Sequence, residues 1–232
     1  MRLSERMVAV AAMVTPGCRL ADVGCDHGYL SLWLCLQGIA KKSIALDVNR
    51  GPLQSAEKHI EAMGLGAYIE TRLSDGLEAV SPGEVDSVVI AGMGGRLICR
   101  ILSRGETVIR NIRELIVEPQ SEAAEVRGFL EREFFQIERE NMVQESGKFY
   151  PVIRAIPSRE KSRLTGEELR FGPQLLKNRH PLLRQYLERE EENYRGIEAG
   201  LRGQNSGRAA ARQTEIQEEL RYIRRAKTYY EK

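Results

Sequence analysis

The sequence predicts an α/β fold: a doubly wound sheet of seven strands, the last one antiparallel, followed by a helical domain. Strand and helix patterns alternate with short links through the first two thirds of the chain, which is typical of a parallel sheet. The last two strand patterns have no helix between them, which indicates an antiparallel hairpin at the edge of the sheet. After Pro157 the strand patterns stop. The predicted domains are therefore residues 1–157 and 158–232.

The elements follow in order along the first domain. Residues 4–14 predict a short helix, capped by Ser4, that covers the sheet. A turn leads into a first strand at 19–23 and a helix at 27–36. Further strands are predicted at 43–46, 67–73, 86–91, 115–118, 135–141 and 149–156, with helices at 52–63 and 97–102. Pro119 is predicted to stop the fifth strand, and Ser121 to cap the helix after it.

The C-terminal domain is predicted to be an antiparallel, coiled-coil-like helical hairpin. A turn is expected at 170–173 and a helix break at 203–207. A set of apolar residues recurs at the intervals typical of a coiled coil, with Glu190 as a polar exception. The set is Leu183, Leu187, Tyr194, Ile197, Leu201, Ile216, Leu220 and Ile223. From Pro157 onward the chain has 17 Lys and Arg against 12 Asp and Glu, whereas the rest of the chain has a net charge of −3. A basic tail suits a nucleic-acid backbone, but paired Arg and Glu on a solvated face remain an alternative.

Composition indicates in which compartment the protein acts and which kinds of site it lacks. No apolar run approaches the roughly 18 residues of a membrane span, and the apolar stretch at 7–14 is too short for a signal peptide. The four cysteines lack C-x-x-C spacing and only three histidines accompany them, so we expect free thiols and no metal site. We therefore expect a cytoplasmic protein without membrane or metal partners, acting as a monomer or weak dimer.

The turn after the first strand is the first candidate site. Residues 22–28 read D-x-G-x-D-x-G, not the G-x-G-x-x-G of a dinucleotide site, and they precede a predicted helix. Gly24 and Gly28 allow the backbone to bend and to approach a ligand closely. Asp22 and Asp26 would repel a pyrophosphate but suit a ligand with a cationic centre. S-adenosylmethionine (SAM), with its sulfonium and ammonium groups, fits this description.

Carboxylates also follow the next two strands. Asp47 is placed to accept hydrogen bonds from ribose hydroxyls, and Asp75 from the N6 amino group of an adenine. Asp residues that serve only as helix caps are the alternative explanation. The predicted SAM-binding residues are Asp22, Gly24, Cys25, Asp26, His27, Gly28, Tyr29, Asp47, Val48, Asp75, Gly76, Ala91, Gly92 and Met93.

The fourth and fifth strands are predicted to end beside the substrate. Glycines in Ala91-Gly92-Met93-Gly94-Gly95 allow a flat base to lie close to the backbone. Met93 either lines the path of the methyl group or packs in the interior. Gln120 either hydrogen-bonds a base edge or belongs to a strand-end turn. Together with the acidic first turn, the terminal hairpin predicts the class I methyltransferase form of the Rossmann sheet, not the dehydrogenase form.

Several segments resemble the bacterial tRNA (adenine(22)-N(1))-methyltransferase family. They are DVGCDHGYL at 22–30, IAGMGG at 90–95, GKFY at 147–150 and RFGP at 170–173, with LSER at 3–6 and the helical tail extending the similarity over the whole chain. The resemblance implies a class I SAM-dependent enzyme with a coiled-coil-like C-terminal domain that methylates N1 of adenine 22 in tRNA. Cys25, Gly28, Asp47 and Gln120 depart from the family pattern, where Ser, Ala, Glu and Asn are expected or frequent.

The predicted catalytic candidates are Asp26, Met93 and Gln120. Neutral adenine N1 already has an in-plane lone pair, so catalysis would depend mainly on positioning. Because the methylated ring is cationic, Asp26 either stabilises that charge or pairs with the SAM ammonium group. His27 can stack, form a hydrogen bond or have no chemical role. The alternative functions are methylation of another RNA base, a small molecule or a protein, an NAD(P) oxidoreductase, and a non-catalytic RNA-binding module with a vestigial SAM pocket.

Overall fold

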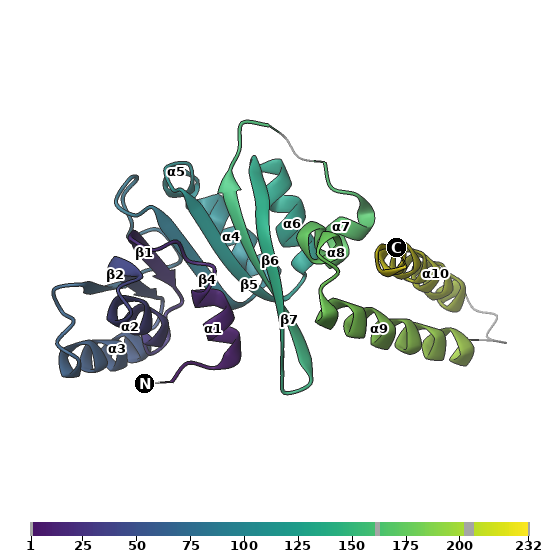
Figure 1. The fold of residues 1–232 in the computed structure, drawn as a ribbon, viewed down its shortest axis with the longest axis horizontal. Coiled ribbons are helices and arrows are strands. Elements are labelled where there is room, and N and C mark those ends of the chain that lie inside the picture. Colours follow the sequence, from purple (N-terminus) through teal and green to yellow (C-terminus); the bar gives the residue numbers. More distant parts are fainter. Residues whose placement is uncertain (1, 161–162, 202–206, 232) are drawn as a thin grey trace. The chain divides into compact units, whose positions relative to one another are not determined.

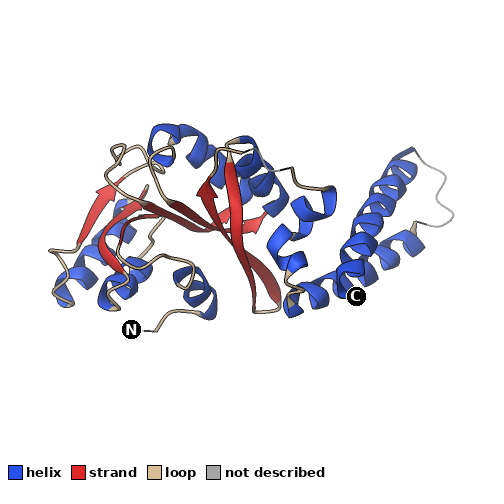
Figure 2. Ribbon diagram, turned by 45° about the horizontal axis from the view of Figure 1, so that its top comes forward, coloured by secondary structure: helices blue, strands red, loops and turns tan. Residues whose placement is uncertain are grey.

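The computed structural model describes residues 2–160, 163–201 and 207–231. The chain divides into two compact units, Met1–Ser162 and Arg163–Lys232 (Figures 1 and 2). Of the helix break predicted at 203–207, only Gly207 is described, as the first residue of a helix, and residues 203–206 lie outside the described residues.

The first unit is built on a seven-stranded sheet in the order β3-β2-β1-β4-β5-β7-β6 (Figure 1). Its strands are β1 (Cys18–Val23), β2 (Ala40–Asp47), β3 (Ile69–Leu73), β4 (Ser87–Gly94), β5 (Glu114–Ser121), β6 (Phe135–Glu145) and β7 (Lys148–Pro157). Strands β1 to β5 pair in parallel, and β7 lies antiparallel between β5 and β6. The predicted sheet and its antiparallel last strand are confirmed.

The hairpin between β6 and β7 explains that last strand. Its tight turn consists of Ser146 and Gly147, which have positive φ angles of 50° and 75°. Two consecutive residues with positive φ make the kind of turn that follows the natural twist of an antiparallel pair. The chain therefore returns directly along β6 and inserts β7 beside β5.

Helices cover both faces of the sheet. They are α1 (Glu5–Ala11), α2 (Tyr29–Leu36), α3 (Arg50–Ala62), α4 (Gly95–Arg104), α5 (Glu106–Ile109) and α6 (Ala123–Arg132). Helices α1, α2 and α3 pack on one face and α4 and α6 on the other (Figure 2). Leu20, Val89 and Ile116, from three central strands, form the core beneath α1 and α2. The predicted Ser4 cap is confirmed, because its side chain accepts a hydrogen bond from the Met7 N–H.

Several predicted element ends are wrong, including that of the fourth strand, which continues past Ala91 to Gly94; three others have a clear local cause. Strand β5 does not stop at Pro119, because the ladder to β4 is irregular opposite this residue and its missing N–H is not required there. The cap of α6 is Glu122, with φ 49°, and not Ser121. Helix α2 begins at Tyr29, so His27 lies in the preceding turn and not in the helix.

The described residues of the second unit form helices and the short links between them. It contains α7 (Gly166–Phe171), α8 (Pro173–Lys177), α9 (Pro181–Gly200), α10 (Gly207–Lys227) and the short 3₁₀ helix η1 (Thr228–Tyr230). Helix α10 packs against α7 and α9. The turn predicted at 170–173 is shorter than expected, since Arg170 and Phe171 end α7 and only Gly172 separates it from α8.

The apolar seam of α9 is also shorter than predicted. Leu183 and Leu187 are fully buried, but Ile197 is 42% exposed. Between them, the buried Glu191 accepts a hydrogen bond from Lys227 of α10 at 2.6 Å. The coiled-coil-like spacing is therefore buried only in the first half of α9. Among the described residues, no helix is long and apolar enough to cross a membrane, and no group of three or more potential ligand residues could hold a metal ion.

Candidate functional site

The turn between β1 and α2 requires glycine at two positions. Gly24 has φ 71°, and a Cβ added there would lie 2.2 Å from Cε of Met93. Gly28 has φ 74°, and a Cβ there would lie 3.0 Å from Cβ of Ala56 in α3. The turn is also attached to β2, because the Gly24 and Cys25 N–H groups both donate to the Leu46 carbonyl. A side chain at either glycine would strain the backbone and press on its neighbour.

Asp22 points into the protein and not toward the open edge of the turn. Its Oδ2 accepts hydrogen bonds from the Ser31 N–H at 3.3 Å and the Ser31 hydroxyl at 2.7 Å. Helix α2 has no side-chain cap, since its cap residue is Gly28. Asp22 therefore caps this helix from the strand, and its negative charge faces the positive end of the helix dipole. Burial raises the pKa of Asp22 to about 6.

Asp47 connects the ends of β1 and β2. One of its carboxylate oxygens accepts from the Asp26 N–H at 3.3 Å and the other from the Asn49 N–H at 2.8 Å. An ionised carboxylate has about four acceptor positions, so two contacts leave capacity for ligand hydroxyls. Val48 follows with its side chain exposed at 62%, an unusual state for valine that provides an apolar surface beside Asp47.

Asp26 and His27 occupy the exposed rim of the turn. Asp26 has φ 53°, and its carboxylate is 72% exposed, 3.5 Å from the His27 ring nitrogen Nε2. The His27 carbonyl lies 3.2 Å from Nδ1 of His59 in α3, and the His59 ring stacks on Tyr29 with centroids 5.1 Å apart. His59 could not be predicted as part of this turn, because nothing in its local sequence pattern links α3 to it.

Asp75 is engaged by a residue outside the predicted site. Its carboxylate accepts a hydrogen bond from Arg104, at the end of α4, at 2.8 Å. The next residue, Gly76, has φ 67°, and a Cβ there would lie 2.8 Å from Ile101. A nucleobase that used Asp75 would have to share this carboxylate with Arg104.

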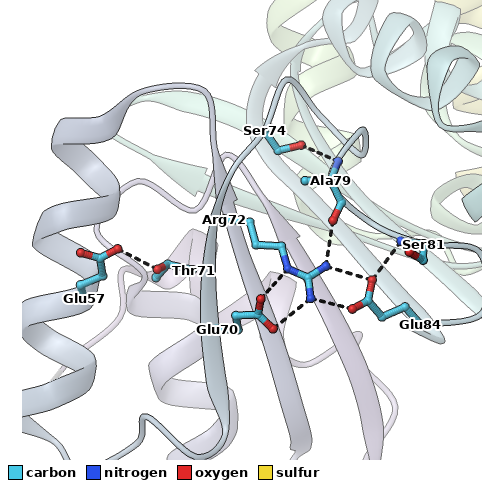
Figure 3. Close-up of polar contacts among 8 residues, drawn as sticks. All are labelled: Glu57, Glu70, Thr71, Arg72, Ser74, Ala79, Ser81 and Glu84. Atoms are coloured by element: carbon cyan, nitrogen blue, oxygen red, sulfur yellow. Dashed lines mark hydrogen bonds and ion pairs between the residues drawn. The ribbon is translucent and has the colours of Figure 1, made fainter.

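A network around Arg72 fixes the loop that carries Asp75 (Figure 3). The Arg72 guanidinium donates to both oxygens of Glu70, to both oxygens of Glu84 and to the Ala79 carbonyl. These bonds hold the pKa of Glu84 at about 2. The Ser74 hydroxyl accepts from the Ala79 N–H and donates to the Gly76 carbonyl, which closes the loop on itself. The sequence analysis did not identify this network.

The irregular end of β4, residues 92–94, where the pairing with β5 shifts register, is called the Gly92–Gly94 loop below, and it faces the β1 turn through Met93. Gly92 has φ 78°, and a Cβ there would lie 3.8 Å from the side-chain nitrogen of the exposed Gln120. The Gly92 N–H donates to the fully buried carboxylate of Glu118 at 2.7 Å. Ala91, just before this loop, is only half-buried.

The carboxyl ends of the strands therefore bring most of the predicted residues together. Met93 links the irregular end of β4 to Gly24, and Asp47 links the end of β2 to Asp26. A cavity of about 500 Å³ in the same unit is lined by Arg19, Lys42 and Tyr68 among others, and by none of the predicted site residues. The site is therefore defined by the turns at the strand ends, where ligands of open α/β sheets bind.

Comparisons with known proteins point to one family. Residues 20–225 match the family model of tRNA (adenine(22)-N(1))-methyltransferase. The curated tRNA (adenine(22)-N(1))-methyltransferase of Bacillus subtilis (strain 168) is 36% identical over 172 residues, which cover 74% of this chain and 72% of the relative.

Solved structures agree with the family match. The crystal structure of the B. subtilis m1A22 tRNA methyltransferase TrmK has a TM-score of 0.88 at 29% identity and covers 97% of this chain and 98% of its own. A Streptococcus pneumoniae structure in complex with S-adenosyl-L-methionine has a TM-score of 0.86 at 34% identity, with 97% and 99% covered. M. capricolum TrmK, solved with S-adenosyl-homocysteine, has a TM-score of 0.87 at 28% identity, with 99% of both chains covered.

Proposed function

The chain belongs to the tRNA (adenine(22)-N(1))-methyltransferase family, and from this premise we propose how its residues carry out SAM-dependent methylation of N1 of adenine 22 in tRNA. The observation that supports the proposal best is the contact between Met93 and Gly24. This contact brings the irregular end of β4, where the substrate base is expected, against the turn that is expected to hold the methyl donor.

The residues at the strand ends fit SAM. The turn at 24–28 offers a close backbone approach, and the buried Asp47 retains acceptor capacity for ribose hydroxyls. The exposed side chain of Val48 suits the flat face of an adenine. Asp75 is proposed to contact the adenine amino group, in competition with Arg104. When bound, SAM supplies an electrophilic methyl group.

Asp26 is assigned to cofactor binding. Its carboxylate is 72% exposed, and water screens the field of an exposed charge. Such a carboxylate can pair with an ammonium group at the rim of the turn, but it stabilises the charge of a buried ring only weakly. Asp22 has a different role, because its carboxylate is committed to Ser31 at the start of α2.

The chain's contribution on the substrate side is mainly positioning. Adenine N1 needs no proton removed before it attacks, so its rate depends on its alignment with the methyl group. The proposal places the target base on the Gly92–Gly94 loop, with Met93 toward the cofactor and Gln120 at the base edge. Base 22 normally lies within the folded tRNA, so the enzyme must extract it at a cost of about a few kcal/mol.

The second unit is proposed to contact the tRNA backbone. Many of its arginines are engaged by glutamates, as in the pairs Arg184–Glu188 and Arg212–Glu215. A cavity of about 750 Å³ is bordered by Lys177, Arg179, Arg225 and Tyr229, together with two glutamates. Cations beside an aromatic ring suit phosphates and unstacked bases. The proposal treats residues 163–232 as the tRNA-binding unit of a cytoplasmic enzyme that acts as a monomer or weak dimer.

A methylation assay on tRNA distinguishes this function from the alternative functions. Purified protein incubated with deuteromethyl-labelled SAM and unmodified tRNA should yield labelled 1-methyladenosine, detected by nucleoside mass spectrometry. A small-molecule or protein methyltransferase would leave the tRNA unlabelled. A non-catalytic RNA-binding module would bind tRNA without any turnover.

A further inference from the structure

Arg6 lies between two carboxylates near the carboxyl ends of β5 and of the edge strand β6. Its Nη1 is 3.5 Å from Oε2 of Glu118 in β5, and its Nε is 3.6 Å from Oε2 of Glu145 in β6. The guanidinium also sits over the ring of Tyr150 in β7, 5.0 Å from the centroid. Three segments singled out in the sequence, at 3–6, 118–120 and 147–150, therefore meet around one guanidinium, and the proposed function gives none of Arg6, Glu118 or Tyr150 a role.

Glu118 connects this cluster to the Gly92–Gly94 loop, which is the proposed substrate loop. Its side chain is completely buried, and its Oε2 accepts the Gly92 N–H at 2.7 Å. Gly92 precedes Met93 and lies beside Gln120, the two residues proposed to border the target base. A change in the position or charge of Glu118 therefore reaches this loop through one backbone hydrogen bond.

The hydrogen-bonding capacity of the cluster is not fully used, as it would be in a purely structural ion pair. Glu118 Oε1 and Arg6 Nε are both buried, and neither has a hydrogen-bond partner among the described residues. The guanidinium of Arg72, by contrast, is bonded on all sides by two carboxylates and a carbonyl (Figure 3). Buried polar groups normally find partners, and those that do not are concentrated where function requires them.

The charge balance of the cluster is also informative. One guanidinium faces two carboxylates, so the group carries one excess negative charge when both are ionised. Methylation at N1 makes the adenine ring cationic. A negative charge held in a buried, low-dielectric position beside the substrate loop stabilises such a ring more effectively than an exposed one does.

We propose that Glu118, oriented by Arg6, is a positioning residue for methyl transfer. It fixes the Gly92–Met93 loop through the Gly92 N–H and supplies negative charge on the side where the adenine ring becomes cationic. The inference rests on the proposed function. It assigns to the buried Glu118 the electrostatic role for which the exposed Asp26 is poorly placed.

The substitution Glu118→Gln tests the charge with little change of shape. The amide oxygen of Gln can still accept the Gly92 N–H, so the loop is expected to stay in place. We expect kcat to fall at least tenfold, while the affinity for SAM and the KM for tRNA change less than threefold. A role in stability alone would lower the melting temperature and leave kcat unchanged.

The pH profile of kcat provides a second readout. Burial raises the pKa of Glu118 above its ordinary value, and the groups that face its carboxylate are Arg6, Glu145, the Gly92 N–H and the Tyr150 ring next to Arg6. The wild-type kcat should rise with pH as Glu118 ionises, and Glu118→Gln should abolish that rise. Arg6→Met removes a stabilising cation and should move the midpoint to higher pH. Glu145→Gln frees Arg6 for Glu118 and should move the midpoint to lower pH.

A buried ion pair between α6 and β6 is the matched control. Arg127 and Glu140 are 1% and 0% exposed, with Nε and Oε1 2.8 Å apart. Glu140→Gln should lower the melting temperature without changing kcat or its pH profile, when assayed below the melting transition. If Glu118→Gln proves unstable, the opposite shifts of the Arg6 and Glu145 variants still decide the question.

Two results would overturn the inference. One is a Glu118→Gln enzyme with wild-type kcat and pH profile, and the other is Arg6→Met and Glu145→Gln profiles that both coincide with the wild type. Failure of the proposed function would look different, because the wild-type protein itself would then form no 1-methyladenosine in tRNA.

Discussion

The Cε atom of Met93 lies directly over Gly24, 2.2 Å from the position that a Cβ on residue 24 would occupy. The two residues belong to loops that are 69 positions apart in the chain. Their contact brings the proposed substrate side and the proposed cofactor side of the site together, so each can be perturbed through the other.

Gly24→Ala should damage SAM binding in two separable ways. The φ of 71° strains any L-residue, by about 1–2 kcal/mol, and the new methyl group collides with Met93. The double variant Gly24→Ala/Met93→Ala should recover part of the SAM affinity, measured by calorimetry, because it relieves the collision but not the strain. Identical affinities in the single and double variants would show that Met93 does not restrict the turn.

Asp47→Ala should weaken SAM binding at least tenfold, which corresponds to about 1.4 kcal/mol. The substitution removes the acceptor for the proposed ribose hydroxyls and for the Asp26 and Asn49 N–H groups. Asp47→Asn keeps one acceptor oxygen and should lie between the wild type and the alanine variant. An unchanged dissociation constant for Asp47→Ala would remove Asp47 from the SAM site.

Asp26→Asn should raise the dissociation constant for SAM and leave kcat at saturating SAM close to the wild-type value. The variant retains the size of the side chain but loses the charge proposed to pair with the SAM ammonium group. Steady-state kinetics at several SAM concentrations measure both effects. A fall in kcat by orders of magnitude that saturating SAM does not rescue would instead place Asp26 at the reacting ring.

Asp22 should make the folded protein less stable as the pH rises from about 4 to 6. Its pKa is raised by burial from 3.8 to about 6, so in this window the folded state binds more protons than the unfolded state. The contribution of Asp22 to the free energy of unfolding is present in full below pH 3.8 and is lost as the pH rises past the pKa of Asp22 in the folded protein. In total it amounts to roughly 3 kcal/mol.

The variant Asp22→Asn isolates this contribution. Its melting temperature should lack the decline between pH 4 and 6 that Asp22 gives the wild type, while an amide oxygen still accepts from Ser31. If the melting temperatures of the two proteins differed by the same number of degrees at every pH in this range, the assignment of the pKa to Asp22 would be contradicted.

Lys177→Ala/Arg225→Ala should weaken tRNA binding and reduce the salt dependence of that binding by about two counterions. Both residues border the cavity of the second unit. The affinity for SAM should not change. The matched control is Arg212→Ala, since Arg212 does not border this cavity and is paired with Glu215 at 2.8 Å. Equal tRNA affinities and equal salt slopes in all three proteins would exclude this surface from tRNA binding.

The strands and their sequence along the chain could be predicted because each strand pattern is local. The alternation of strands and helices and the missing helix before β7 were sufficient for the sheet and its antiparallel last strand. The end of β5 was not predictable in this way. A proline normally ends a strand, and here the irregular pairing of Met93 with β5 removes the need for its N–H.

The site was predictable as a set of strand ends but not as a set of side-chain directions. Asp22 follows Leu20 by two residues on the same face of β1, which is a signal for an inward-facing side chain, but its partner Ser31 becomes evident only in the fold. Likewise, Glu118 follows the buried Ile116 by two residues. The contacts of His59 and Arg6 depend on α3 and α1 packing against distant strands and turns, which no local pattern specifies.

The central claim is that this chain methylates N1 of adenine 22 in tRNA. Its most direct test compares two transcripts of one tRNA, one with adenine and one with guanine at position 22, each incubated with the protein and labelled SAM. Nucleoside mass spectrometry should detect labelled 1-methyladenosine from the first transcript and none from the second. Equal labelling of both transcripts, or no labelled 1-methyladenosine from either, would contradict the claim.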